Sequence, residues 1–258
     1  MTTPPHRQGI VTHATTQGGR SHQEDRYVEE WIDDVGGISG WLLAVFDGHR
    51  SAETSALAAD QLVPLFKYQL ETNSVPMTAL FETVFATLRD LTVDHLSGST
   101  ASIAFISADA QEVTIGVLGD SPIAILDAQG QMFLGADHNV RTNLQERSAA
   151  EERGGVYREG YLEDRRQPGT GLQMGRALGD RELDRILSRS PDIQTIPLGG
   201  RGIVMVGSDG LLVPLNPLPS QLRTLLSLIQ QGGSADVVVQ NAMTRAIGDN
   251  ITALVWKA

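Results

Sequence analysis

Short apolar runs rich in β-branched residues recur along the chain, and polar or glycine-containing segments separate them. Runs of this length with turn residues on both sides are typical of buried β-strands. Residues 127–130, with the sequence Asp-Ala-Gln-Gly, join one such run to the next, at residues 132–134, which indicates a hairpin and antiparallel pairing. The other predicted strands are residues 41–46, 101–107, 112–118, 122–126, 202–206 and 251–256.

Helical periodicity lies between these strands, and the helical segments occur in pairs. Ser51 and Ser234 each precede one of them and are predicted helix caps. Because the strands form neighbouring runs rather than alternating singly with helices, the pattern favours packed antiparallel sheets with helices outside over parallel β-α-β units. We therefore expect an α+β protein. The predicted helices cover residues 51–67, 76–95, 140–153, 218–229 and 235–246.

The organisation of the chain indicates a single domain spanning residues 1–258. Neither an internal repeat nor a low-complexity linker divides the 258 residues, and this length is common for one sheet-based domain. One region stands apart, because acidic and basic residues crowd together between residues 146 and 166. Two interpretations remain open for it: a charged surface loop with an exposed helix face, or a mobile flap within residues 141–170 beside an active site.

Composition and charge restrict the classes of partner and of chemistry. The chain has 20 Lys plus Arg against 31 Asp plus Glu, a net charge of −11, which disfavours binding to nucleic acid or to an anionic membrane. Cysteine is absent from the sequence, so disulfides, thiolate metal sites and a cysteine nucleophile are excluded. No apolar run reaches the roughly 18 residues that span a bilayer. We expect a soluble, monomeric protein of the cytoplasm or nucleus.

Acidic residues follow or precede the apolar strands at several points. Asp47 and Gly48 come directly after one strand, Asp209 and Gly210 after another, and Asp249 precedes a third. A single Asp-Gly pair is usually only a turn. Carboxylates gathered at one end of several buried strands, however, repel one another unless cations compensate them. The pattern therefore indicates hard divalent cations held by oxygen, magnesium or manganese rather than zinc.

Eight short motifs together give the sequence a specific resemblance over nearly its whole length. The chain resembles the metal-dependent serine/threonine protein phosphatases of type 2C, the PPM family, in which such motifs occur in the same order. Here they begin at Gly19 (sequence GRSHQED), Phe46 (FDGH), Gly98 (GSTA), Gly119 (GDS), Asp137 (DH), Gly175 (GRALGD), Ser208 (SDG) and Asp249 (DNIT).

The resemblance implies a four-layer αββα sandwich, in which helix pairs flank two central antiparallel sheets, with a two-metal centre at one end. It implies that Asp47 bridges two tightly held Mn2+ or Mg2+ ions, that the Gly48 carbonyl joins one of them and that Asp209 and Asp249 bind the other. Glu24 and Asp25 would contact the metals, mostly through water, and Asp120 would hold a third, weaker ion with Asp209. Arg20 would bind the phosphate of a phosphorylated protein substrate, and His49 would be the general acid.

Elementary chemistry agrees with two of these roles. A guanidinium clamps a phosphate dianion at two points, which suits Arg20, although an arginine without its flanking Gly19 and Glu24-Asp25 pair would be ordinary surface. A serine alkoxide is a poor leaving group, so an acid with a pKa near neutrality assists its departure, and His49 lies two residues beyond Asp47. A loop histidine without this neighbour would likewise be read as surface.

The sequence also departs from the family pattern. Arg50 stands where the family usually has glycine, Pro122 where it usually has arginine, and Gly175 where serine is frequent. We expect Arg50 to add bulk and charge at the mouth of the site, and the other two to alter packing only. Besides the leading interpretation, hydrolysis of phosphoserine and phosphothreonine, two alternatives remain open: a catalytically weak scaffold that keeps the fold, and a phosphatase of small phosphoesters.

Overall fold

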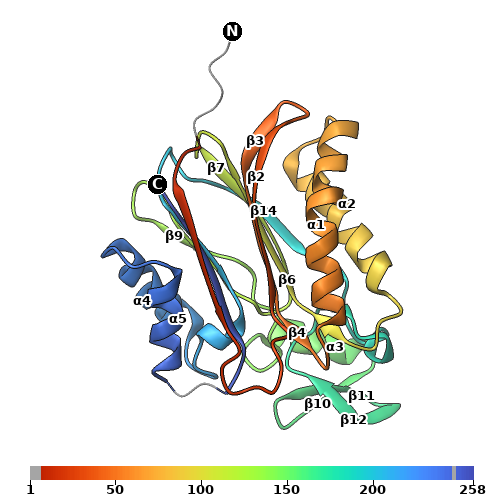
Figure 1. Cartoon of the computed structure of the whole chain (residues 1–258). Coiled ribbons are helices and arrows are strands. Elements are labelled where there is room, and N and C mark those ends of the chain that lie inside the picture. Colours follow the sequence, from red (N-terminus) through yellow and green to blue (C-terminus); the bar gives the residue numbers. More distant parts are fainter. Residues whose placement is uncertain (1–6, 246–247) are drawn as a thin grey trace.

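Two antiparallel five-stranded sheets lie face to face in the centre of the molecule, as Figure 1 shows. This computed structural model describes residues 7–245 and 248–258. The first sheet has the order β1-β16-β15-β8-β9, with bounds Ile10–Thr16, Ile251–Lys257, Ile203–Gly207, Ile123–Leu126 and Met132–Leu134. The second has the order β14-β7-β6-β3-β2, with bounds Asp192–Pro197, Glu112–Leu118, Ala101–Ser107, Ile38–Phe46 and Arg26–Val35.

A pair of helices covers the outer face of each sheet (Figure 1). Helices α1 (Glu53–Thr72) and α2 (Met77–Thr92) pack on the second sheet, where the ring of Phe66 lies 5.2 Å from that of Phe105. Helices α4 (Leu218–Gln230) and α5 (Ala235–Met243) pack on the first sheet. The molecule is thus the α+β sandwich of four layers that the resemblance implies.

The burial of both faces explains why the central strands are apolar at almost every position. In β3, Leu42 and Ala44 face the helices, whereas Leu43 and Val45 face the other sheet. The inner face of the first sheet meets them with residues such as Trp256, which is fully buried. Because successive side chains of a strand point to opposite faces, a strand in the middle of four layers needs apolar residues at odd and even positions alike.

Several element boundaries differ from the predicted ones. Helix α1 has Ala52 rather than the predicted Ser51 at its N-cap position, although the Ser51 hydroxyl accepts a hydrogen bond of 3.4 Å from the Glu53 N–H. Ser234 occupies the N-cap position of α5, as predicted, but its side chain accepts no hydrogen bond from the helix backbone. The third helix, α3 (Leu144–Glu152), begins later than predicted because the side chain of Asn143 accepts hydrogen bonds from the first turn. The predicted end of the last helix, Ala246, lies outside the described residues.

The charged segment of residues 141–170 is structured and has a small core of its own. It contains α3 and most of a three-stranded sheet, whose strands are β10 (Gly155–Arg158), β11 (Tyr161–Asp164) and β12 (Gln167–Leu172). This core is one cluster of buried residues that includes Leu162, Ala150, Val140 and Ile186. Figure 1 shows this sheet at the lower end of the sandwich, near β4 (Gly48–His49). Its mobility stays a prediction.

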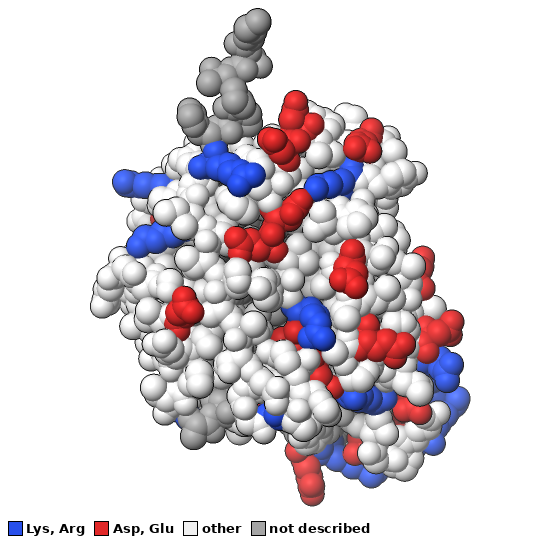
Figure 2. Space-filling model, viewed as in Figure 1, with Lys and Arg blue, Asp and Glu red and all other residues white. Residues whose placement is uncertain are grey.

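Two surface properties complete the description. Across residues 7–245 and 248–258, the helices are all too short or too polar to cross a membrane. On the face seen in Figure 2, acidic and basic side chains are interspersed.

Candidate metal centre

Five aspartates lie at the end of the sandwich that carries β4, which is the lower end in Figure 1. Asp47 follows β3 and Asp25 precedes β2, which meet at the same sheet end because the two strands are antiparallel. Asp209 follows β15 and Asp249 precedes β16 in the other sheet for the same reason, and Asp120 follows β7. The two sheets therefore bring together carboxylates that are far apart in the sequence.

Close backbone contacts hold the loops that carry these residues. A Cβ atom at Gly48 would lie 2.6 Å from the carbonyl oxygen of Glu24, so only glycine allows the two loops to approach this closely. Asn250 ties a third loop to them: its amide oxygen accepts a hydrogen bond from the Glu24 N–H, and its amide nitrogen donates to the carbonyls of Gln17 and His22. Asn250 thereby positions the loop that carries Arg20.

The electrostatics of the cluster are those of crowded acids. Burial first, and then repulsion from Asp25 and Asp209, raises the pKa of Asp47 well above its ordinary value. Burial and the charge of Asp209 raise the pKa of Asp120 to about 8, and burial followed by repulsion from Asp249 raises that of Asp209 to about 6. Burial also raises the pKa of Asp25. Burial and mutual repulsion of these carboxylates thus destabilise the folded chain, and a bound cation would offset both effects.

Unpartnered oxygen atoms support the same interpretation. The Oδ1 atoms of Asp25 and Asp120 are buried and have no hydrogen-bond partner in the described residues, although Thr252 donates to the other oxygen of Asp25 at 2.7 Å. Hard cations take oxygen ligands of this kind, so the donor set fits magnesium or manganese. In residues 7–245 and 248–258 no three acidic or histidine side chains already form a ready cage for one ion.

Glu24 contributes through its backbone in this structure. Its N–H donates to Asn250 and its carbonyl accepts a hydrogen bond of 2.6 Å from Ser55. The Glu24 side chain makes no hydrogen bond or ion pair with the described residues. A contact between its carboxylate and a metal, mostly through water, therefore stays a prediction.

Arg20 lies at the rim of the cluster and is half exposed. Its guanidinium forms an ion pair with Asp249 at 2.8 Å, and its Nε donates to the Gly248 carbonyl at 3.0 Å. Burial works against the charge of Arg20, but Asp249, Asp47 and Asp209 outweigh it and raise the pKa of this side chain. A permanently charged group is thus held beside the carboxylates, where a phosphate dianion would need a cation.

His49 lies in a second, small sheet of order β13-β5-β4, where β5 is Gly98–Ser99 and β13 is Leu178–Gly179. The His49 Nε2 atom lies 2.7 Å from Oδ2 of Asp180, which is fully buried. Sequence analysis placed Asp180 in the GRALGD motif but gave it no role. Only the motif could have drawn attention to Asp180, because the two contacting residues are 131 positions apart in the sequence.

Arg50 adopts a left-handed conformation, with φ of 67°. Glycine adopts this region without strain, which explains why a glycine is usual at this position of the family and why arginine is a departure. Its guanidinium donates to the carbonyl of Leu96 at 3.0 Å and pairs with Glu182 at 3.2 Å. The added charge at the mouth of the site is therefore largely compensated by neighbouring groups.

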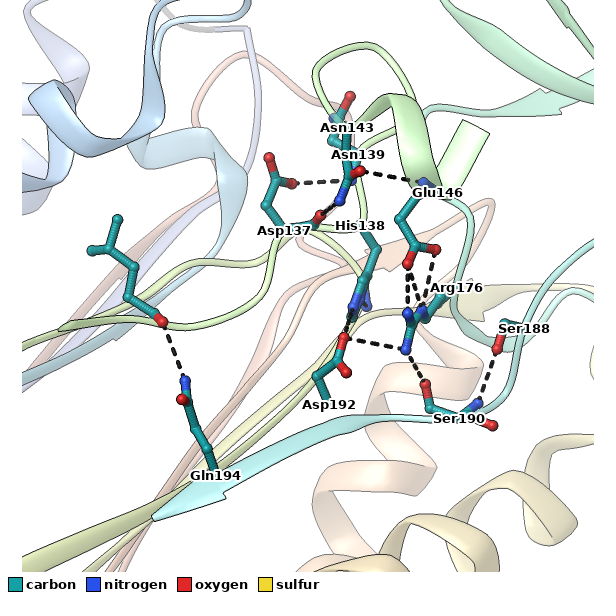
Figure 3. Close-up of polar contacts among 12 residues, drawn as sticks. Asp137, His138, Asn139, Asn143, Glu146, Arg176, Ser188, Ser190, Asp192 and Gln194 are labelled. Atoms are coloured by element: carbon teal, nitrogen blue, oxygen red, sulfur yellow. Dashed lines mark hydrogen bonds and ion pairs between the residues drawn. The ribbon is translucent and has the colours of Figure 1, made fainter. Parts of the chain in front are cut away.

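Figure 3 shows a second polar cluster, around His138, Arg176 and Glu146, which lies between the neighbourhood of Asp120 and the charged segment. Asn139 donates to Asp120 at 2.8 Å, and the preceding residue, His138, is 1 % exposed. The Nδ1 atom of His138 accepts from the Gly119 N–H, which requires the proton on Nε2, facing Asp192 at 2.7 Å. Burial lowers the pKa of His138, and the nearby charge of Arg176 acts in the same direction, against Asp192 and Glu146.

Arg176 extends this cluster to helix α3. It makes two-pronged hydrogen bonds to Glu146, donates to the Ser190 carbonyl at 2.8 Å and lies 3.3 Å from Asp192 (Figure 3). A Cβ atom at Gly175 would lie 3.1 Å from a Glu146 oxygen, so the glycine leaves room for this ion pair. The charged segment is thus anchored to the strand end that carries Asp120.

Two pockets differ in their relation to the cluster. A small one, of about 80 Å³, opens beside Asp120 and Asp209 and is also lined by Arg141, Thr142 and Asn216. A larger one, of about 530 Å³, is lined by Gln8, Ile38 and Phe105 and by none of the five clustered aspartates. Of the two, the smaller pocket is the one that adjoins the acidic cluster.

Comparison with known families and sequences gives one consistent result. The family profile described as "Protein phosphatase 2C" matches residues 11–216. "Probable protein phosphatase 2C 11" of Arabidopsis thaliana is 26% identical over 254 residues, which are 94% of this chain and 65% of that protein. "Probable protein phosphatase 2C 59" of Oryza sativa is 28% identical over 257 residues, covering 94% and 74%. The chain thus spans less than two thirds of the length of the Arabidopsis relative.

Solved structures show the same fold at lower identity. A serine-threonine phosphatase 2C from Toxoplasma gondii aligns with a TM-score of 0.71 and 20% identity, covering 98% of this chain and 96% of that one. A sex determining protein of C. elegans aligns with a TM-score of 0.79 and 22% identity, covering 96% and 64%. The catalytic domain of the serine threonine protein phosphatase PstP, in complex with 2 manganese ions, aligns with a TM-score of 0.62 and 18% identity, covering 96% and 97%.

Proposed function

Because the chain belongs to the protein phosphatase 2C family, we propose that it is a metal-dependent phosphatase that hydrolyses phosphoserine and phosphothreonine in proteins. The observation that carries the proposal is the cluster of five aspartates at one end of the sandwich. Burial raises the pKa values of four of them, Asp25, Asp47, Asp120 and Asp209, and two of their buried oxygens have no hydrogen-bond partner in the described residues. A scaffold without activity would have no need to maintain such a repulsive cluster. We propose further that residues 1–258 act as one catalytic domain.

The residues that would hold the metals are those that the family pattern assigns and that the sandwich brings together. Asp47 and the Gly48 carbonyl would serve one ion, Asp47, Asp209 and Asp249 the other, with Asp25 and Glu24 mostly through water. Asp120 and Asp209 would hold a third, weaker ion. When bound, a pair of Mn2+ or Mg2+ ions lowers the pKa of a shared water and offsets the charge of the attacking and leaving oxygens.

The side chains at the rim perform the remaining steps. Arg20 binds two oxygens of the phosphate and holds it against a protein of net charge −11. His49 donates a proton to the serine or threonine oxygen as it leaves. Arg20 is half exposed and paired with Asp249, so a phosphate that enters the site competes with that carboxylate for the guanidinium.

Phosphate release from a panel of phosphopeptides and small phosphoesters tests the proposal. We expect turnover of phosphoserine and phosphothreonine peptides with manganese or magnesium, and none with excess chelator. Full turnover in chelator would refute the metal dependence. Turnover of small phosphoesters alone would favour the small-molecule alternative, and inactivity on every substrate would favour the scaffold.

A further inference from the structure

The contact between His49 and Asp180 is built by the backbone of the small sheet β13-β5-β4. His49 lies opposite Gly98 in one strand pair, and Gly179 lies opposite Gly98 in the other. The two side chains meet over this glycine: a Cβ atom at Gly98 would lie 1.9 Å from Oδ2 of Asp180 and 2.3 Å from Nε2 of His49. Three strand segments that are distant in the sequence thus leave the space in which these two groups touch.

Burial of the Asp180 carboxylate is energetically unfavourable. The residue is 0 % exposed, its φ is 50°, and its Oδ1 atom has no hydrogen-bond partner among the described residues. The Nε atom of Arg50 lies 3.9 Å from Oδ1. The turn itself is held by backbone bonds, from Asp180 N–H to the Ser97 carbonyl and from Leu183 N–H to the Asp180 carbonyl. The turn therefore does not depend on this carboxylate. Because burying a carboxylate is unfavourable unless it is paired, the contact with His49 needs a separate explanation.

We propose that Asp180 is the positioning residue of His49: it fixes the orientation and the tautomer of the imidazole that protonates the leaving oxygen. This inference rests on the proposed phosphatase function. The 2.7 Å contact has the Nε2–H donating to Oδ2 of Asp180, so Nδ1 is the nitrogen that delivers a proton to substrate.

The proton balance of the step follows. The Nδ1–H bond of the imidazolium breaks as the O–H bond of the seryl alcohol forms and the P–O ester bond breaks. The oxygen of the attacking water forms the new P–O bond, and its released proton restores the imidazolium. Throughout this cycle the contact between Asp180 Oδ2 and Nε2 keeps the ring in one orientation, with Nδ1 free to face the substrate.

Asp180→Asn separates positioning from folding. Asparagine tolerates a left-handed backbone, so the turn should survive. Its amide oxygen should turn toward Arg50 and its amide N–H toward Nε2, which reverses the tautomer of His49. We expect kcat on a phosphoserine peptide to fall by about 10² to 10⁴ with little change in KM, and to fall less on an aryl phosphate, whose leaving group needs little protonation. Adding His49→Gln to this variant should cost nothing further, because both changes remove one function.

Nitrogen-15 NMR of the imidazole, recorded on metal-free protein at alkaline pH, provides a measurement that does not depend on turnover. Wild type should show a protonated Nε2, and Asp180→Asn a protonated Nδ1. Asp184→Asn is the matched control, since Asp184 lies in the same segment but has a side chain 57% exposed and paired with Arg189 at 3.1 Å. That control should leave rate and spectrum unchanged.

Two results would overturn the assignment: an unprotonated Nε2 in wild type, or an Asp180→Asn variant with wild-type kcat or with a loss that multiplies that of His49→Gln. If wild type releases no phosphate from any substrate, the proposed function fails, whereas the NMR comparison still decides whether Asp180 sets the tautomer.

Discussion

Asp209→Asn should stabilise the metal-free protein and remove its stabilisation by metal. Burial and repulsion raise the pKa of Asp209 to about 6 in the absence of cations. Against an ordinary value near 3.9 this is a shift of about 2 units, or about 3 kcal/mol of lost stability at pH 8. The buried amide retains part of the burial cost, so we expect a gain of roughly 1–2 kcal/mol, or roughly 3–6 °C in Tm for a chain of this size.

The sign of the pH dependence provides an internal check. Because the folded-state pKa lies above the unfolded value, the folded protein binds more protons between about pH 4 and about pH 6, and stability falls as the pH rises through that window. The advantage of the asparagine variant should therefore be complete above about pH 6 and vanish near pH 4. A carboxylate that is already protonated gains nothing from replacement by an amide.

Thermal unfolding of chelator-treated protein, with and without manganese, measures both halves of the prediction. Wild type should gain about 2.7 kcal/mol at a metal concentration 100 times Kd, and Asp209→Asn much less. Asp60→Asn is a matched control, because it changes the net charge by the same amount at an exposed position of α1. The reasoning is refuted if the metal-free Asp209→Asn protein is less stable than wild type, or if manganese raises both Tm values equally.

Three further changes test other parts of the site. Arg20→Ala should raise KM for a phosphopeptide by roughly 10- to 100-fold, as expected for a lost pair of charged hydrogen bonds of about 1.5–3 kcal/mol, and an unchanged KM in steady-state kinetics would exclude the clamp. Asp120→Ala should keep two tight metals in calorimetric titration but raise the metal concentration for half-maximal rate; loss of the tight sites, or wild-type turnover across the metal range, would contradict this. Burial lowers the pKa of His138, so the unfolded chain binds more protons and wild-type stability should fall as the pH drops below about 6.5, by at most about 1.4 kcal/mol per pH unit. Denaturant unfolding of His138→Gln at about pH 7.5 and about pH 5.5 should lack this component, and an equal loss in both proteins would assign it to other groups.

Much of the fold was determined by the sequence alone, for a reason visible in the central strands. Residues of β3, β6, β7, β15 and β16 are buried on both faces, so these strands form mostly apolar runs, which are typical of strands covered on both sides. The placement of Asp47, Asp209 and Asp249 at strand ends was equally visible, because the acidic residues directly adjoin those runs.

Within the two five-stranded sheets, the strands that sequence analysis missed share one property: β1, β2 and β14 each form an edge. Edge strands have fewer neighbours to bury their side chains, and the sequence of β2, RYVEEWIDDV, shows the result as charges that interrupt the apolar pattern. The charged segment was ambiguous in the same way. Its strands enclose a small core around Leu162 that contributes too few apolar residues to reveal it.

The partnerships of the site were decided only by the tertiary structure. Arg20 meets Asp249 across 229 residues and His49 meets Asp180 across 131, because antiparallel pairing brings strand ends from both sheets to one place. A motif identifies the type of residue needed at a position, but the register of three short strands decided that the two side chains would meet over Gly98. The left-handed backbone at Arg50 is likewise imposed by the turn, since the local sequence would not select arginine for that conformation.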